Sequence, residues 1–288
     1  MNLDFSLTKY KELCEAISKS RYTPLTIEKY LLLKNKHKPE AFVIIRHDVD
    51  SQPEYALKMA RLENKFGITS SYYFRYIKGV FRKDIMEEIA GLGHEIGYHY
   101  EVLDKARGDF ERAIEIFEEE INKFRRIYDI TTIAPHGSPL MGSLNATSIP
   151  GICNIIKKLI RRENVFTRWD NRDLWKKYDF RDYGILGDAY LSIDFGNILY
   201  LSDTGRDWSS KHKMKDLVRG SNFEQIIRRI RNTDDIINLI RAGNLNMYIL
   251  IHPNQWKETF GEWLNWLLFQ HIRNCGKTIL KLYYKKIS

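Results

Sequence analysis

The ionisable residues of this chain gather directly after stretches that predict buried strands. Four such stretches end in acidic or histidine side chains: Asp48 and Asp50, His99 and Glu101, His136, and His252. In parallel α/β folds, the loops at the carboxyl ends of the strands converge and carry the active site. Carboxylates and neutral imidazoles together are ligands of zinc-like metals. We therefore expect a metal-dependent catalytic site at this edge of a sheet.

The acidic pair Asp48 and Asp50 follows the apolar run 41–45, with His47 just before it. Residues two apart in a strand point to the same side, so both carboxylates are expected to share one face. Two close carboxylates repel each other, and a cation beside them removes that penalty while leaving one of them free as a base. A polar turn with a helix N-cap is the alternative interpretation of this segment.

Three histidines accompany the acidic pair. His99 ends the stretch 94–100, on the opposite side from His94, and its position predicts a metal ligand. His136, within the turn-like Ala134-Pro135-His136-Gly137, is a third ligand, a substrate contact or an incidental turn residue. His252 is a candidate general acid, because an imidazole pKa near 6.5 suits proton donation to a leaving amine. Trp256, close behind, is a candidate wall for a sugar or acyl group, or a core residue.

The elements expected to position these side chains alternate along the chain. Strands are predicted at 41–45, 68–76, 94–100, 131–134, 185–193, 198–202 and 246–251, and helices at 53–66, 81–91, 110–124 and 223–240. Strands alternating with helices indicate parallel, right-handed βαβ units. We expect a helical cap over residues 1–40, with a break at Thr23-Pro24, and a barrel domain over 41–288 with an insertion at 142–167.

Composition narrows the class of protein. The 288 residues are 43% hydrophobic, which suffices for a large core, and the net charge of +9 favours acidic partners. The basic residues are scattered, so each group is better interpreted as a solvated face than as a nucleic-acid stripe. Three cysteines without a CxxC pair favour a reducing compartment, and no run approaches the length of a membrane span. We expect a cytoplasmic protein that does not bind nucleic acid.

At this point the sequence resembles the polysaccharide deacetylases, carbohydrate esterase family 4, and in particular a branch associated with surface-glycan genes. The resemblance covers roughly residues 40–255 and rests on three segments: His47-Asp48-Val49-Asp50, Gly93-His94-Glu95-Ile96-Gly97-Tyr98-His99 and Ile249-Leu250-Ile251-His252-Pro253. It implies an α/β fold, a distorted (β/α) barrel with about seven parallel strands. It also implies that Asp48 is the base, that Asp50 and His99 are metal ligands, and that His252 is the acid. Asp48 and Asp50 are interchangeable at this stage, because the family's acidic pair is adjacent.

Two departures from the family pattern stand out. The family's second histidine, four residues after His99, is replaced by Leu103, so Glu101, Asp104 or His136 must supply the third ligand; we favour His136. The segment Ala134-Pro135-His136-Gly137 lacks the arginine that the family places before its proline. Further pocket residues are expected among those that flank these motifs: His47, Tyr100, Glu101, Asp170, Asn171, Arg206 and Trp256. Asp203 and Arg206 are equally interpretable as a surface ion pair.

These observations predict a hydrolase that uses a divalent metal, zinc by default, to remove an N-acyl group, acetyl first, from a sugar or glycan precursor. Hydrolysis of another non-peptide C–N bond, in a ureide or formamide, is a second hypothesis. A non-catalytic glycan-binding module is a third, suggested by Leu103 and the missing arginine. The sequence does not indicate an oligomeric state.

Overall fold

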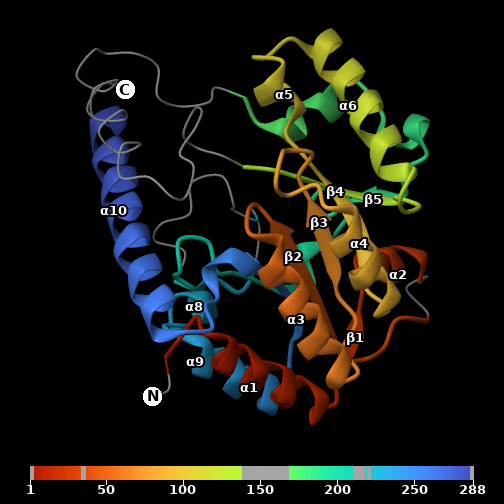
Figure 1. Cartoon of the computed structure of the whole chain (residues 1–288). Helices are drawn as coiled ribbons and strands as arrows, with labels where there is room; N and C mark the ends of the chain where they lie inside the picture. Colours follow the sequence, from red (N-terminus) through yellow and green to blue (C-terminus); the bar gives the residue numbers. More distant parts are fainter. Residues whose placement is uncertain (1–2, 34–36, 138–168, 210–217, 219–221, 286–288) are drawn as a thin grey trace.

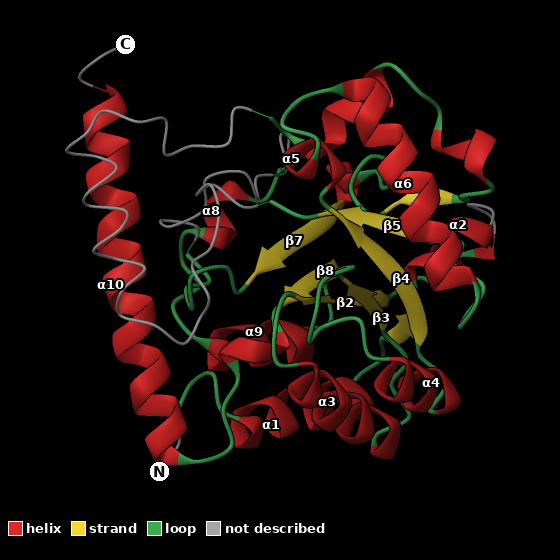
Figure 2. Ribbon diagram, turned by 45° about the horizontal axis from the view of Figure 1, so that its top comes forward, coloured by secondary structure: helices red, strands yellow, loops and turns green. Residues whose placement is uncertain are grey.

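A computed structural model describes residues 3–33, 37–137, 169–209, 218 and 222–285. The expected insertion at 142–167 lies outside the described residues. Seven parallel strands form a curled half-barrel in the order β6-β5-β4-β3-β2-β8-β7, and β1 pairs with β2 (Figures 1 and 2). The strands are β1 (Thr23–Leu25), β2 (Phe42–Val49), β3 (Ser71–Phe74), β4 (Glu95–Tyr100), β5 (Thr132–Pro135), β6 (Gly187–Asp188), β7 (Ile198–Ser202) and β8 (Asn246–Ile251).

Helices surround this sheet, and the α/β barrel-like class expected from the sequence is confirmed. They are α1 (Leu7–Ser18), α2 (Ile27–Leu32), α3 (Pro53–Lys65), α4 (Lys83–Gly91), α5 (Val102–Lys105), α6 (Phe110–Arg125), α8 (Glu224–Ile227), α9 (Thr233–Ala242) and α10 (Phe260–Lys285). Short 3-10 turns cover Asn171–Lys176, Phe180–Tyr183, Phe195–Asn197 and Pro253–Gln255. Within the described residues, no helix has the length and apolar composition needed to cross a bilayer.

Local sequence explains where the main helices begin. Pro53 occupies the first turn of α3, where its missing N–H costs nothing. Asp109 and Asn232 cap α6 and α9 by accepting hydrogen bonds from the backbone N–H groups of Arg112 and Asp235. Asn232 also explains why the helix expected over 223–240 is divided into α8 and α9. Gly243 ends α9 with a φ of 68°.

The core has three parts. One lies where α1, α3 and α9 pack on β2, β7 and β8, and a second lies where α4 and α6 pack on β3, β4 and β5. The third fills the inside of the curl and includes Ile44, Tyr73, Ala134 and Tyr248. All eight positions of β2 are buried, as expected for a strand covered on both faces.

The strand predictions differ in accuracy. The predictions for β7 and β8 match the observed bounds, whereas the strand expected at 185–193 is wrong except for the two residues of β6. Asp188 ends that strand because its carboxylate accepts hydrogen bonds from the N–H groups of Tyr190 and Leu191, which form a turn. The expected helical cap over residues 1–40 contains α1 and α2 and also β1, which starts at the predicted break.

Candidate metal centre

Three strand ends bring Asp50, His99 and His136 together. Asp50 follows β2, His99 lies in β4, and His136 follows β5. The Oδ1 atom of Asp50 lies 3.5 Å from His99 Nε2 and 3.5 Å from His136 Nε2. One ligand atom from each of the three residues lies within 4.8 Å of the others. The structure thus assembles the three residues that the sequence nominated as metal ligands.

The ring of His99 is fixed by the neighbouring strand. The pairing of β4 with β5 places Ala134 beside His99, and the ring Nδ1 lies 3.0 Å from the Ala134 carbonyl oxygen. A carbonyl only accepts, so this nitrogen carries the proton and Nε2 presents its lone pair to Asp50. The ring is almost completely buried, at 1% exposure. His99 is therefore held in the tautomer that a metal ligand requires.

Glu101 lies behind His136. Its Oε2 is 3.1 Å from His136 Nδ1, an ion-pair contact without hydrogen-bond geometry, and it accepts a hydrogen bond of 2.6 Å from Arg75. Burial alone raises the pKa of Glu101, but His136 and Arg75 outweigh it and hold that pKa well below its usual range. The carboxylates of Glu101 and Asp50 therefore face the two ring nitrogens of His136, one on each side of the ring.

The geometry of these groups fits a small cation. Two ligand atoms at about 2.0–2.1 Å from a tetrahedral zinc are separated by about 3.3 Å, close to the 3.5 Å observed from Asp50 to each histidine. The Oδ1 atom of Asp50 is buried and has no hydrogen-bond partner. A carboxylate with an unused oxygen facing the Nε2 atoms of two imidazoles is a donor set for a divalent metal.

Asp48 lies on the same face as Asp50, as strand alternation predicts, with its Oδ2 3.4 Å from His99 Nε2. Arg46, two residues earlier in β2, donates from Nε and Nη2 to the two oxygens of Asp48, each at 2.7 Å. The Arg46 side chain is fully buried and lies over the rings of Tyr190 and Tyr73. Sequence reasoning gave Arg46 no role, and the structure shows that it fixes the orientation of Asp48.

His252 lies at the end of β8 and is paired with Asp203, which follows β7. Its Nδ1 lies 2.6 Å from Asp203 Oδ1, and the same carboxylate accepts hydrogen bonds from the His252 backbone N–H and the Trp256 indole. Burial lowers the pKa of His252, but Asp203 outweighs it and raises the pKa to about 9. Asp203 is completely buried, so its interpretation as a surface ion pair with Arg206 is wrong.

The remaining candidates lie around this centre with other partners. His47 is completely buried on the opposite face of β2, stacked on Tyr72, with its Nε2 2.8 Å from Glu63 Oε1. Strand alternation explains its direction, because His47 adjoins Asp48 in sequence. The structure does not bring His47 to the candidate ligands, and no substrate reaches it without a rearrangement.

Tyr100 and Trp256 are also inside the protein. Tyr100 donates to Asp188 at 2.8 Å and accepts from Trp175, while Trp256 packs against Phe5. Neither side chain is exposed. Trp256 donates to Asp203 and so supports the Asp203–His252 pair, and neither Trp256 nor Tyr100 is accessible to a substrate in this structure.

Asn171 connects two parts of the site. Its amide donates to the His136 carbonyl at 2.8 Å and its carbonyl accepts from the Leu103 N–H at 3.0 Å. Leu103, within α5, is buried in the apolar core, and Asp104 accepts a hydrogen bond from Asn171 and is not part of the ligand cluster. Of the three residues considered as the third member of the cluster, His136, which follows β5, is the one that lies beside Asp50 and His99.

Asp170 and Arg206 lie at the margins. Asp170 caps the turn Asn171–Lys176 and pairs with Arg172 at 2.5 Å. Arg206 donates to the Trp263 carbonyl at 3.3 Å and lies over the ring of Phe5, between the N-terminal segment and α10. Burial lowers its pKa to about 10. Its contacts tie α10 to the body of the protein.

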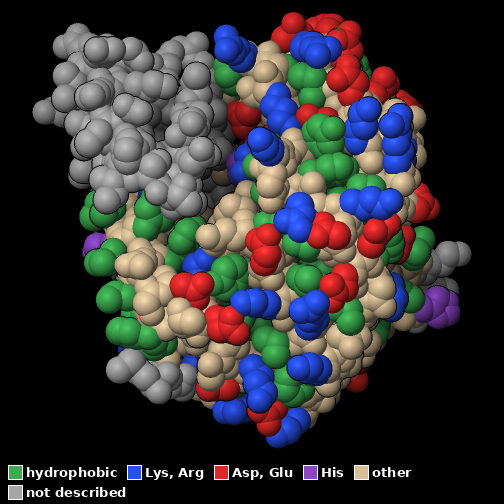
Figure 3. Space-filling model, in the orientation of Figure 1, with side chains coloured by type: hydrophobic (Ala, Val, Ile, Leu, Met, Phe, Trp, Pro, Cys, Tyr) green, Lys and Arg blue, Asp and Glu red, His purple; other side chains and the backbone are tan. Residues whose placement is uncertain are grey.

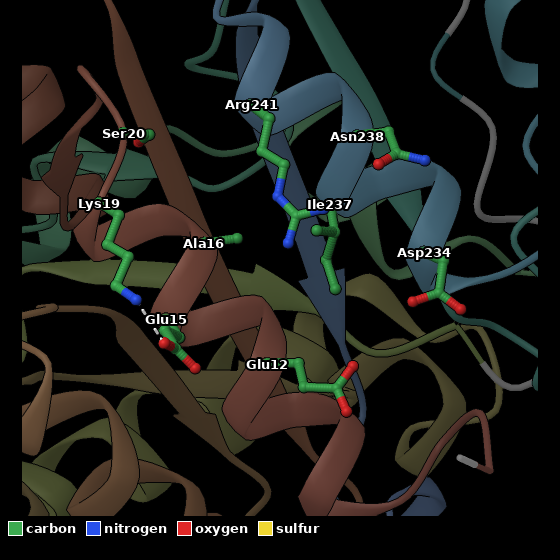
Figure 4. Close-up of a pocket in the computed structure, with 9 residues that line it drawn as sticks. All are labelled: Glu12, Glu15, Ala16, Lys19, Ser20, Asp234, Ile237, Asn238 and Arg241. Carbon is green, nitrogen blue, oxygen red and sulfur yellow. Dashed lines mark hydrogen bonds and ion pairs between the residues drawn. The ribbon is translucent and has the colours of Figure 1, made fainter.

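The visible face of the described residues (Figure 3) and one surface pocket both carry charges of mixed sign. The visible face in Figure 3 carries Lys and Arg intermixed with Asp and Glu, without a stripe of one sign. A pocket of about 370 Å³ lies between α1 and α9 (Figure 4), lined by Glu12, Glu15, Ala16, Lys19, Ser20, Asp234, Ile237, Asn238 and Arg241. Its charges are of both signs, and none of its residues belongs to the metal centre.

No family model matches the sequence, and no curated protein matches it. Among solved structures, the chain is similar to a CE4 family pseudoenzyme from Bacillus anthracis, with 12% identity and a TM-score of 0.36, over 83% of this chain and 63% of that one. It is also similar to a mutant of that pseudoenzyme with restored enzymatic activity, with 12% identity and a TM-score of 0.34, over 83% and 65%. The chain thus covers less than two thirds of these proteins. Likenesses at this level carry no weight for the chemistry, which depends on the side chains described above.

Proposed function

We propose that this protein is a metal-dependent hydrolase that removes an N-acyl group, acetyl in the first instance, from a sugar or glycan precursor. The observation that carries the proposal is the convergence of Asp50, His99 and His136 at 3.5 Å contacts, with His99 fixed by the Ala134 carbonyl and Glu101 lying 3.1 Å behind His136. A buried cluster of this kind is costly unless a cation fills it. The choice of substrate follows the sequence resemblance to polysaccharide deacetylases.

Asp50, His99 and His136 would hold the cation, zinc by default. When bound, such an ion lowers the pKa of a water molecule and polarises an acyl carbonyl. Asp48 accepts the proton of the attacking water, since its Oδ2 lies 3.4 Å from the ligand atom of His99. Arg46 keeps that carboxylate aimed at the centre through two hydrogen bonds.

His252 donates a proton to the departing amine from the other side of the site. Its raised pKa of about 9 keeps the imidazole protonated at neutral pH, which an acid needs before the C–N bond breaks. Asp203 orients the ring through Nδ1 and leaves Nε2–H free to donate. Base and acid thus come from β2 and β8, which are adjacent in the sheet.

Metal content and turnover of the purified full chain test the proposal. We expect about one equivalent of zinc, cobalt or nickel per chain, and release of acetate with a free amine from an N-acetylated sugar panel. The variant His99→Ala should lose the metal and most activity, whereas His271→Ala, at an exposed position on α10, should lose neither.

Two outcomes would contradict the proposal. A chain that binds none of these metals has no such centre, and full activity of the metal-free protein would remove the cation from the reaction. Bound metal without turnover of any N-acyl sugar, ureide or formamide would instead favour the non-catalytic glycan-binding module.

A further inference from the structure

The C-terminal helix α10 runs along one side of the molecule and is tied to the loop that carries Asp203 (Figures 1 and 2). Asn274 donates from its amide to the Gly205 carbonyl at 2.9 Å, two residues beyond Asp203. Nearer the start of α10, the Trp263 indole donates to the Asp4 carbonyl at 2.7 Å. These contacts fix the segment of α10 that contains Arg273 beside the acid side of the metal centre.

Among the residues that the structure describes, Arg273 has no hydrogen-bond or ion-pair partner. Its Nε is buried without a hydrogen bond, and no carboxylate of the described residues lies within ion-pair distance of it. Its guanidinium lies 5.6 Å from the centre of the Phe269 ring. Burial lowers the pKa of Arg273, and the opposing electrostatic effect comes from Asp50, the candidate metal ligand. The contact of the neighbouring Asn274 with Gly205 and this effect of Asp50 both place the guanidinium near the centre, and no ion pair joins Arg273 to Asp50.

The other carboxylates around the centre have cationic partners. Asp48 is paired with Arg46, Glu101 with Arg75 and Lys105, and Asp203 with His252. Among the described residues, Asp50 is the carboxylate left for the cation and Arg273. A divalent ion and one guanidinium bring three positive charges and Asp50 offsets one, so two are uncompensated. A neutral N-acetyl sugar would leave this imbalance, whereas a substrate with an anionic group would remove it.

We propose that Arg273 binds an oxyanion of the substrate, a phosphate or a carboxylate, so that the enzyme acts on an anionic N-acyl sugar. This inference rests on the hydrolase function proposed above and narrows its substrate class. The planar fork of an arginine matches both oxyanions with paired hydrogen bonds, and its free Nε–H is one of the donors that such pairing uses.

Three sugars that share the acetamido group and differ in charge test the inference: N-acetylglucosamine, N-acetylglucosamine 1-phosphate and N-acetylmuramic acid. Binding is measured by calorimetry on the zinc-loaded full chain carrying His252→Ala, so that the sugars are not turned over. In this background, Arg273→Gln should raise the Kd of the preferred anionic sugar roughly 10- to 100-fold, the loss of one charge-assisted contact. Arg273→Lys should recover part of the affinity, and the neutral sugar should bind equally to all variants.

Arg228→Gln is the matched control, because Arg228 is an exposed arginine paired with Glu224. It should leave all three Kd values unchanged. The charged sugar that loses affinity in Arg273→Gln identifies the oxyanion as phosphate or carboxylate. Equal binding of both anionic sugars to Arg273→Gln and to its parent would overturn the inference. It would also be overturned if the parent bound N-acetylglucosamine as tightly as it binds the two anionic sugars. Zinc binding is measured on the same samples, so a failure of the metal centre is distinguished from a failure of Arg273 alone.

Discussion

The pair Arg46 and Asp48 gives a quantitative test of how the proposed base is held. Both side chains are at most 5% exposed, and two hydrogen bonds of 2.7 Å join them. The variant Arg46→Met keeps most of the volume and leaves the Asp48 carboxylate buried without its counter-charge. Removing one member of a buried ion pair costs about 3–5 kcal/mol of unfolding free energy. We expect a loss of this size at pH 7 in the metal-free protein.

Urea unfolding followed by tryptophan fluorescence and far-UV circular dichroism measures this loss. The double variant Arg46→Met/Asp48→Leu removes both charges, and we expect it to recover most of the stability because no unpaired ion is left inside. Arg46→Lys keeps the positive charge but loses the two parallel hydrogen bonds of the guanidinium. Its free energy of unfolding should therefore lie between those of Arg46→Met and the parent. A loss below about 1 kcal/mol in Arg46→Met, or a double variant no more stable than the single one, would refute the reasoning.

Four further predictions concern the proposed acid and the residue behind His136. His252→Ala should retain the metal and lower turnover roughly 10²–10⁴-fold, and metal analysis with steady-state kinetics would expose an error if turnover stayed unchanged. The protonated imidazole is the active form, so turnover should fall as pH rises through about 9. In Asp203→Asn, the pH at which turnover falls should move toward the ordinary imidazole pKa of about 6.5. An unchanged pH profile in this variant would show that Asp203 does not raise the pKa of His252. The same raised pKa contributes stability that is complete below about pH 6.5 and is lost as pH rises through about 9. Glu101→Gln should weaken zinc affinity roughly 10- to 100-fold in a chelator competition, and full affinity would show that Glu101 does not support His136.

The fold was largely predictable because β7 and β8 are continuous apolar runs bounded by polar residues. The stretch 185–193 failed because Asp188 sits within it, and a buried carboxylate that caps a turn is not visible in an apolar pattern. The helix α10 was not predicted, although it is a long element of the described chain. Propensity and pattern indicate an element's type better than its partners, which depend on tertiary contacts.

The candidate ligands were predictable because strand ends converge at one edge of the sheet. Two further residues, Arg46 and Asp203, could have been predicted to lie at this site from their positions in the strands. Arg46 lies two residues before Asp48, so strand alternation alone places both on one face, whereas it sends His47 to the other. Asp203 follows β7 directly, the same signal that nominated His252. The direction of the Asp203 carboxylate could not be predicted, because it depends on the indole of Trp256.

The three candidate ligands fall within residues 50–136, at the ends of β2, β4 and β5, and the four strands from β2 to β5 follow one another both along the chain and across the sheet. Asp203 and His252 are synthesised later and join from the other flank of β2. The second half of the chain also supports the first: β8 pairs along β2, and the Asn171 amide holds the carbonyl of His136. The candidate ligands and the proposed proton donor are thus parts of one cooperative unit, and a substitution that loosens β8 should disturb both.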